Sequence, residues 1–443
     1  MSNGQQQVMR AAETYLPQLQ QRNGTVPPWL RRIREEGINR FAELGFPTTQ
    51  MEDWKYTNVA PIANVPFQLP GAVAASARLA EHVHLLRGRA SNTLVFVNGR
   101  YAAELSSLRA LPAGAKIGSL AAALEAEGPL VEPHLGRYAS PTQQSFTALN
   151  AAFLDDGALV YLAKGTDVTE PIHVLFVSTA PGQPTIACPR NLIVAEEHSR
   201  VTVVESYVGV DGGSYFTNAV TEIAVGPRAQ VDHYRLQREA EEAFHVATIQ
   251  VRQDAASHFA SHSISLGGAL VRTDINIVLD AEGCECELDG LYVARGTQHV
   301  DHHTMIDHKK PRGTSRELYK GILDGRATGV FNGKVFVRPN AQKSDAQQVN
   351  RNLLLSDDAV MNTKPQLEIF ADDVKCSHGA TIGRLDDEAL FYLRSRGIGE
   401  TSARQLLTYA FASELIGRIK VEPIRVQLDQ ILWSRLHGTG PEA

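Results

Sequence analysis

The stretch RVTVVESYV, residues 200–208, decides the fold, because its side chains change character at every second position. A period of two is typical of a half-buried β-strand, whereas an amphipathic helix repeats every three to four residues. Turns containing glycine, proline, aspartate or asparagine separate this stretch from similar ones. The same period recurs in AQVDHYRLQ (229–237), VATIQVRQ (246–253), SHFASHSIS (257–265), TDINIVLD (273–280) and CECELDGLYV (284–293).

This long series of consecutive strands predicts a solenoid. It starts near residue 157, and no helical pattern interrupts it before residue 384. A β-sandwich accounts for seven to nine short strands, and the strand-forming region is too long to fit one such domain easily. A solenoid, in which each coil stacks only on its neighbours, accommodates that length more easily. We therefore expect residues 156–383 to form one long solenoid of strands, with a sandwich or a barrel as the alternative.

The region before the strands, residues 1–155, is expected to be rich in helix. The segment PPWLRRIREEGINRFAELG, residues 27–45, has helical spacing and ends at a glycine. A second helix is expected to start at Thr49, and a third lies in SLAAALEAEG, residues 119–128, which also ends at a glycine. Between them, TLVFVNGRY, residues 93–101, predicts a hairpin around its Asn-Gly pair.

The region after the strands, residues 384–443, is expected to be helical. Asp386 or Asp387 can cap a first helix, and Ser402 with Gln405 forms the capping-box pattern of a second. An apolar stripe with helical spacing follows at Ala403, Leu406, Leu407, Ala410, Phe411 and Leu415. Such a stripe normally faces a core. A short helical pair after a solenoid has little body to pack against, so a partner subunit is the alternative.

Composition excludes several classes of protein. The 443 residues are 43% hydrophobic and 21% charged, as in globular proteins, and the formal net charge is −6. A nucleic-acid-binding protein would normally carry a basic face, so we expect no nucleic-acid partner. No apolar run approaches the length of a membrane span, and the polar N-terminus lacks a signal-peptide core. We therefore expect a cytoplasmic protein whose four cysteines are free thiols.

Cys376 and His378, in ADDVKCSHGATIG (371–383), are the candidate metal ligands. In an extended strand they share one face, and both side chains suit zinc, copper or iron. Two ligands cannot complete a tetrahedral shell, so the alternative is a buried free cysteine beside a hydrogen-bonded histidine. Val374 and Ile382 lie on the same face, which predicts that both donors point inward or toward a covered seam, unless Gly379 bends the strand.

The other residues that could bind a metal are weaker candidates for a metal site. Cys284 and Cys286 also share a face, but no further ligand lies at metal-site spacing, so we expect ordinary core cysteines. The run HVDHHTMIDHKK matches no zinc pattern, and we expect its histidines to be exposed on strands near a turn. These are His299, His302, His303 and His308. The chain also lacks a nucleotide-binding P-loop, a G-x-S-x-G elbow and the cysteine set of a stable iron–sulfur protein.

Three segments resemble the SufD family, the SufB-related subunits of the iron–sulfur cluster assembly complex. They are YKGILDGRATGVFNGKVFVRPNAQKSDAQQVNRNLLLS (319–356), TKPQLEIFADDVKCSHGATIG (363–383) and DDEALFYLRSRGI (386–398). The resemblance is strongest over residues 290–415, and PTTQMEDWKYTN (47–58) is similar to the family's N-terminal aromatic motif. The sister family SufB usually carries extra N-terminal cysteines and a cysteine just after the segment that matches VNRNLLLSDD. Neither is found here, so a SufB-like subunit is the alternative.

The resemblance implies a mainly β fold, a right-handed parallel β-helix flanked by helical N-terminal and C-terminal regions. It implies a non-catalytic scaffold subunit that pairs with SufB at the end of the β-helix and binds the SufC ATPase, the enzyme of the complex, through residues 384–443. Cys376 and His378 then lie at the SufB–SufD interface as candidate ligands of iron or of a transient, shared iron–sulfur cluster. Opening of the interface would expose donors that are buried at rest.

Other hypotheses remain open at this stage. A carbohydrate-active enzyme on a β-helix would need a distinctive carboxylate pair, which the sequence lacks. A stable metalloprotein would use the histidine-rich run. The sequence also leaves open whether the isolated chain forms a homodimer, and whether the complex takes a flavin.

Overall fold

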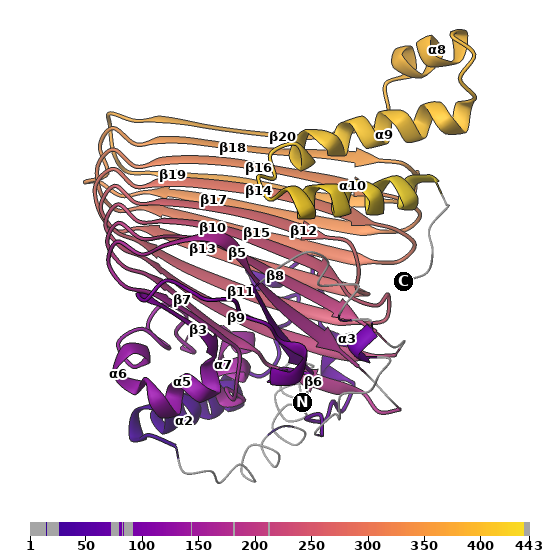
Figure 1. The fold of residues 1–443 in the computed structure, drawn as a ribbon. Coiled ribbons are helices and arrows are strands. Elements are labelled where there is room, and N and C mark those ends of the chain that lie inside the picture. Colours follow the sequence, from indigo (N-terminus) through magenta and orange to yellow (C-terminus); the bar gives the residue numbers. More distant parts are fainter. Residues whose placement is uncertain are drawn as a thin grey trace.

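The computed structural model describes residues 15, 26–71, 79–81, 83, 92–142, 144–179, 182–210 and 213–437. The first ten residues, from which we expected no signal peptide, lie outside these ranges, as do residues 438–443. The remaining chain builds a stack of β-strands with helices at both ends (Figure 1).

Two sheets form the body of the molecule, and we call them sheet A and sheet B. Sheet B contains, in spatial order, β2 (Arg100–Tyr101), β1 (Asn92–Val97), β5 (Asp167–Ser178), β8 (Arg200–Gly209), β10 (Gln230–Arg238), β12 (His258–Ser265), β14 (Glu285–Ala294), β16 (Thr314–Leu323), β18 (Asp345–Leu354) and β20 (Lys375–Gly383). Sheet A contains β19 (Val360–Ile369), β17 (Thr328–Val337), β15 (His299–His308), β13 (Leu270–Leu279), β11 (Phe244–Gln253), β9 (Tyr215–Val225), β7 (Arg190–Ala195), β4 (Ala158–Leu162) and β3 (Ala115–Ser119), with β6 (Thr185–Ala187) beside β9.

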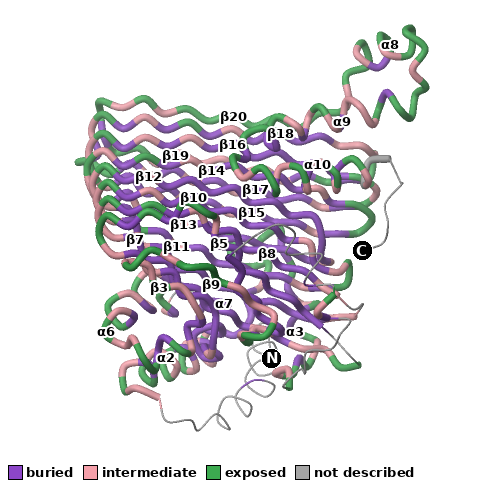
Figure 2. Tube along the Cα trace, viewed as in Figure 1, coloured by how far each residue is buried: buried purple, intermediate pink, exposed green. Residues whose placement is uncertain are grey.

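From β7 onward the chain alternates between the two sheets, so that each strand from β9 to β20 lies on the strand two places before it. Pairing is parallel and in register from β8 to β20, as expected for stacked coils. Apolar side chains from both sheets meet between them in one continuous core. Most residues of the stacked strands are accordingly buried (Figure 2). The predicted β-solenoid is confirmed, with about seven turns and helices at both ends.

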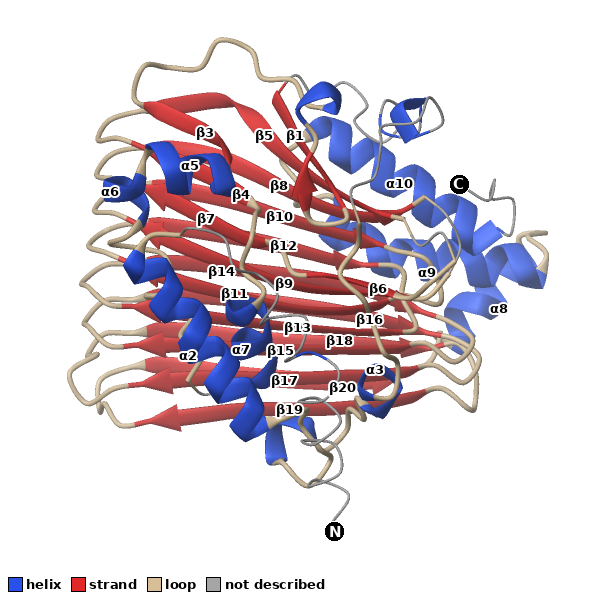
Figure 3. Cartoon of the chain, turned by 90° about the horizontal axis from the view of Figure 1, so that it is seen from below, coloured by secondary structure: helices blue, strands red, loops and turns tan. Residues whose placement is uncertain are grey.

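Helices and short helical turns cover parts of the solenoid. In the described part of the chain they are α2 (Pro28–Leu44), η1 (Glu52–Trp54), α3 (Ala60–Ala63), η2 (Ala103–Leu105), α5 (Leu120–Ala126), α6 (Gly128–Val131), α7 (Ser145–Ala152), α8 (Asp387–Ser395), α9 (Glu400–Ile416) and α10 (Glu422–His437). Helices α2 and α7 pack together over sheet A (Figure 3), where an aromatic cluster that includes Phe41 and Phe146 meets Phe216 of β9. The predicted hairpin is also present, since β1 and β2 are antiparallel.

Two predicted helix starts and one predicted stop were wrong. Only the short turn η1 follows Thr49. Trp54, its last residue, packs against Arg272 of β13, and this contact ends the helical turn. Ser402 lies inside α9, because the chain is already extended at Gly399 and the helix begins one residue later. Gly128 is the first residue of α6 rather than the end of a helical segment.

Helices α9 and α10 lie across the outer face of sheet B (Figure 1). Ala412, Leu415 and Ile416 of α9 are buried there against the strands. Of the predicted apolar stripe, Leu415 and the half-buried Phe411 belong to this contact, whereas Ala410 is exposed. Charged contacts fix the same helix: Lys320 of β16 donates to the Phe411 carbonyl, 2.9 Å away, and contacts Glu414. Just after the helix, Arg418 donates to Asp289 of β14 at 3.1 Å.

Two glycines inside the solenoid make room for tyrosines of neighbouring strands. A Cβ atom at Gly290 would lie 2.1 Å from the ring of Tyr319, and a Cβ at Gly321 would lie 2.3 Å from the ring of Tyr292. Both tyrosine rings are fully buried, so they have nowhere to move. Each glycine therefore leaves the space that the tyrosine of the neighbouring coil needs, and only a coil with that tyrosine fills it.

We expect Gly290→Ala to destabilise the protein by about 1–3 kcal/mol, because the added methyl group overpacks the core. Gly379→Ala is the matched control, since it adds a methyl group to a strand where nothing lies within 4 Å. Urea unfolding of the two variants measures the difference. Equal stability of the two variants would contradict this account of the coil packing.

Candidate functional site

The last coil of the solenoid is open. Within the described residues, β20 pairs only with β18, and β19 pairs only with β17. One edge of each strand therefore presents unpaired backbone N–H and C=O groups. Val360, Ile369, Phe370 and Ile382 are large apolar side chains that are exposed along these strands and just after them. An end of this kind is suited to receiving another polypeptide.

Cys376 and His378 lie on β20 in this open coil. Their register partners on β18 are Ala346 and Gln348, which are both buried inside the solenoid. Side chains at paired positions of a parallel ladder share a face, so both donors face the interior, as the sequence pattern predicted. The expected burial is not found in the single chain: Cys376 is half-buried and His378 is exposed, because no further coil of the described chain covers them.

The two donors differ in their surroundings. Cys376 packs at the edge of a small apolar cluster that contains Val335, Val337 and Ala346. This burial raises the pKa of its thiol above the usual value, so the group is protonated at neutral pH. Since the thiolate is the form that binds metal, binding at Cys376 must release a proton.

A buried polar pair lies beneath His378. Gln348 of β18 is paired in register with Glu317 of β16, and its Nε2 donates to Glu317 Oε2 at 2.7 Å. Both side chains are buried, and burial raises the pKa of Glu317 to about 7. The column from the open end inward is therefore His378, Gln348 and Glu317, one residue from each successive strand of sheet B.

Glu317→Gln should stabilise the protein increasingly as the pH rises from 5 to 8. A carboxyl group with a raised pKa holds its proton in the folded state, so the wild type loses stability from about pH 4.5 to about pH 7. The neutral amide removes this loss, and the stability difference should grow by roughly 3 kcal/mol. Urea unfolding at each pH measures it, with the exposed Glu285→Gln as the matched control. A difference that stays constant would show that Glu317 titrates normally.

The other sequence candidates lie elsewhere. Cys284 and Cys286 are buried, as expected of core cysteines. The expectation of exposed histidines on β15 was wrong for His302 and His308, which are fully buried. They face the interior, and burial lowers the pKa of His302 to about 3 and that of His308 to about 4. His299 and His303 are half-buried beneath the 51–57 segment.

Among the described residues, no three histidine, cysteine, aspartate or glutamate side chains come together as a group that could hold a metal ion. The open coil accordingly offers two donors, Cys376 and His378, from one strand. Such a pair can bind a metal only with ligands from another molecule or from solvent.

A cleft on the outer face of sheet A was not foreseen from the sequence. It has a volume of about 610 Å³ and lies between β11 to β19 and two segments, residues 51–54 and 138–147. Its floor carries four carboxamides. The positive charge of Arg272 is paired with two carboxylates, those of Asp274 and Asp301. The carboxamides are those of Gln250, Asn276, Asn332 and Gln366. Only the tertiary fold brings these distant residues together.

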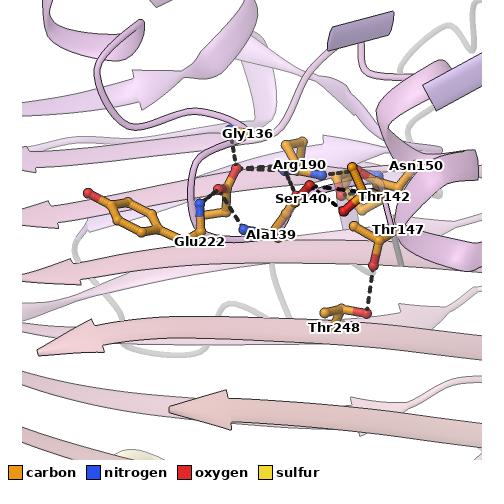
Figure 4. Close-up of polar contacts among 11 residues, drawn as sticks. Gly136, Ala139, Ser140, Thr142, Thr147, Asn150, Arg190, Glu222 and Thr248 are labelled. Atoms are coloured by element: carbon orange, nitrogen blue, oxygen red, sulfur yellow. Dashed lines mark hydrogen bonds and ion pairs between the residues drawn. The ribbon is translucent and has the colours of Figure 1, made fainter. Parts of the chain in front are cut away.

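One wall of the cleft is fixed by a buried ion pair (Figure 4). Arg190 and Glu222 are fully buried and lie 2.6 Å apart between Nη2 and Oε1. Glu222 also accepts hydrogen bonds from the backbone N–H groups of Gly136, Tyr138 and Ala139. The pair therefore holds the segment that leads into the cleft wall against β9.

Arg190→Met should destabilise the protein by about 3–5 kcal/mol, because it leaves the charge of Glu222 buried without its partner. The matched control is Arg228→Met, which removes an exposed ion pair with Glu197 and should cost less than about 1 kcal/mol. Chemical denaturation measures both. A loss at Arg190 no larger than that of the control would mean that the pair does not hold the wall.

The fold and the open coil can now be compared with known proteins. Residues 10–174 match the family model of the SufBD protein N-terminal region, and residues 176–411 match that of the SUF system FeS cluster assembly, SufBD core domain. The chain belongs to the SufBD family of iron–sulfur cluster assembly proteins. Its role therefore lies in iron–sulfur cluster assembly.

Individual relatives refine the comparison. An iron–sulfur cluster assembly SufBD family protein of Synechocystis is 35% identical over 93% of this chain and 92% of its own length. The iron–sulfur cluster assembly protein SufD of Escherichia coli is 32% identical over 91% of this chain and 92% of its own length. Protein ABCI7, chloroplastic, of Arabidopsis thaliana is 30% identical over 90% of this chain and 84% of its own length. The resemblance to the SufD family is thus confirmed.

The described helices bear on the membrane question as well. None of them is long and apolar enough to cross a membrane. The cytoplasmic location stays a prediction, and the Arabidopsis relative is chloroplastic by its name.

Proposed function

We propose that the chain is a non-catalytic scaffold subunit that pairs with a SufB-like subunit and binds a SufC-like ATPase. Family membership and the SufD names of the Escherichia coli and Bacillus subtilis relatives support the assignment. The single observation that carries it is the open last coil, where two metal-binding side chains lie on a strand whose outer edge is unpaired.

The open coil is the proposed contact with the SufB-like subunit. A homologous solenoid end would supply strands for the free edges of β19 and β20 and would cover the exposed Ile382 and Phe370. A second copy of this chain has the same end, so a homodimer is the competing arrangement when the chain is isolated. Co-purification with a SufB-like chain in place of a second copy distinguishes the two.

Cys376 and His378 are the proposed half of a shared site. Thiolate and imidazole both suit iron, and the partner would provide the remaining ligands. The iron–sulfur cluster is cargo here: it is built at the contact and then leaves for an acceptor protein. Incomplete coordination by each subunit suits this role, because separation of the subunits removes half of the ligands at once.

The C-terminal helices, within residues 384–443, are the proposed contact with the ATPase. Helix α8 stands away from the solenoid (Figure 1), and its Phe391 and Tyr392 are 74% and 57% exposed. Exposed aromatic residues of this kind are common anchors of protein interfaces. ATP hydrolysis would take place in the partner.

His378→Ala should lower the yield of iron–sulfur cluster in a reconstituted complex at least about tenfold, because a direct ligand is lost. Assembly of the complex should be unaffected, since the exposed imidazole contributes no packing in the single chain. Cluster absorbance measures the yield, and size-exclusion chromatography measures assembly. His258→Ala, on the outer face of β12, is the control. An unchanged yield in His378→Ala would rule out the ligand role.

A further inference from the structure

One buried oxygen atom beneath the open coil has no hydrogen-bond partner among the described residues. Gln348 Oε1 is inaccessible to solvent and accepts no hydrogen bond there, whereas Glu317, one strand further in, accepts from Gln348 and Thr304. A buried carbonyl oxygen without a donor costs free energy, so native proteins normally keep such atoms only where water or a ligand group satisfies them. Gln348 lies near the open end, one strand below His378.

The orientation of the Gln348 carboxamide is fixed on two sides. Its Nε2 donates to Glu317 Oε2 at 2.7 Å, which directs the carbonyl oxygen away from that contact. Across the interior, Gly333 of β17 leaves the space that the amide fills, since a Cβ atom there would lie 2.4 Å from Gln348 Nε2. The free acceptor is therefore preorganised rather than mobile.

His378 is the register partner of Gln348 on the last strand, and its imidazole can donate a hydrogen bond. It faces the same interior as Gln348. Neighbouring strands lie about 4.8 Å apart, so an imidazole and a carboxamide on the same face are within reach of a hydrogen bond. Cys376 lies above Ala346, which has no polar atom in its side chain.

A histidine that binds a metal through one ring nitrogen carries a proton on the other. That N–H is almost always donated to a carboxylate or carbonyl oxygen, which fixes the tautomer and the orientation of the ring. We propose that Gln348, held by Glu317, is the positioning residue that accepts the N–H of His378 when His378 binds iron or the nascent cluster. The inference rests on the proposed ligand role of His378.

Co²⁺ binding to the full chain in complex with its SufB-like and SufC-like partners tests the inference, with the visible absorption of bound cobalt as the readout. Gln348→Leu should lower the affinity about 10- to 100-fold, since it removes the acceptor and leaves the ligands in place. The exchanged pair Glu317→Gln with Gln348→Glu retains an acceptor beneath His378 and should restore the affinity to near the wild-type value.

Asn350→Leu is the matched control. Asn350 is also a buried amide of β18, two positions along, but its register partner on β20 is Ala380. A merely structural role of Gln348 predicts equal losses of cobalt affinity in the two leucine variants, and this result would overturn the inference. Thermal unfolding of both variants establishes that they fold to a similar extent.

The remaining outcomes separate the inference from the proposed function. If His378→Ala abolishes cobalt binding and Gln348→Leu leaves it unchanged, the ligand role stands and the positioning role is wrong. If His378→Ala itself has no effect, both fail. Should Gln348→Leu not fold, the exchanged pair decides the question, because an affinity as low as that of His378→Ala would overturn the positioning role.

Discussion

The backbone hydrogen bonds between in-register parallel strands are the constraint on which the molecule depends. Each coil satisfies the N–H and C=O groups of the coil before it, and therefore needs a further coil or a cap of its own. At the N-terminal end, the short antiparallel strands β2 and β3 are the outermost strands of the two sheets. At the other end, the described chain leaves β19 and β20 uncovered. The two ends therefore differ in the edge strands that they present: short antiparallel strands at one end, and full-length parallel strands at the other.

The same pairing of strands determines where the candidate metal ligands lie. Because paired positions of the ladder share a face, an interior position of the last coil is both oriented toward the core and accessible to a partner. Cys376 and His378 occupy two such positions, above Ala346 and Gln348. In any earlier coil the same side chains would be permanently buried, as His302 is between the rings of Tyr292 and Tyr319. The site therefore follows from the position of the coil in the stack as much as from the residues.

Much of this organisation could be predicted from the sequence, because strand period and side-chain parity are local properties. They indicated the solenoid and the shared inward face of Cys376 and His378. The exposure of His378 could not be predicted, because parity does not reveal that a coil is the last one. The burial of His302 and the column beneath His378 depend on register between strands that are distant in the sequence. The cleft was not foreseen, because its four carboxamides come from four strands that are distant from one another in the sequence.

The attachment of the C-terminal helices has a mechanical consequence. Lys320 and Arg418 tie α9 and the segment after it to β16 and β14, and β16 lies two strands from the open edge of sheet B. A force applied to the projecting helix α8 is thus transmitted through α9 to β14 and β16, and not to the strands of sheet A over which α2 and α7 pack. Movement of α8 is therefore coupled mechanically to the C-terminal half of sheet B.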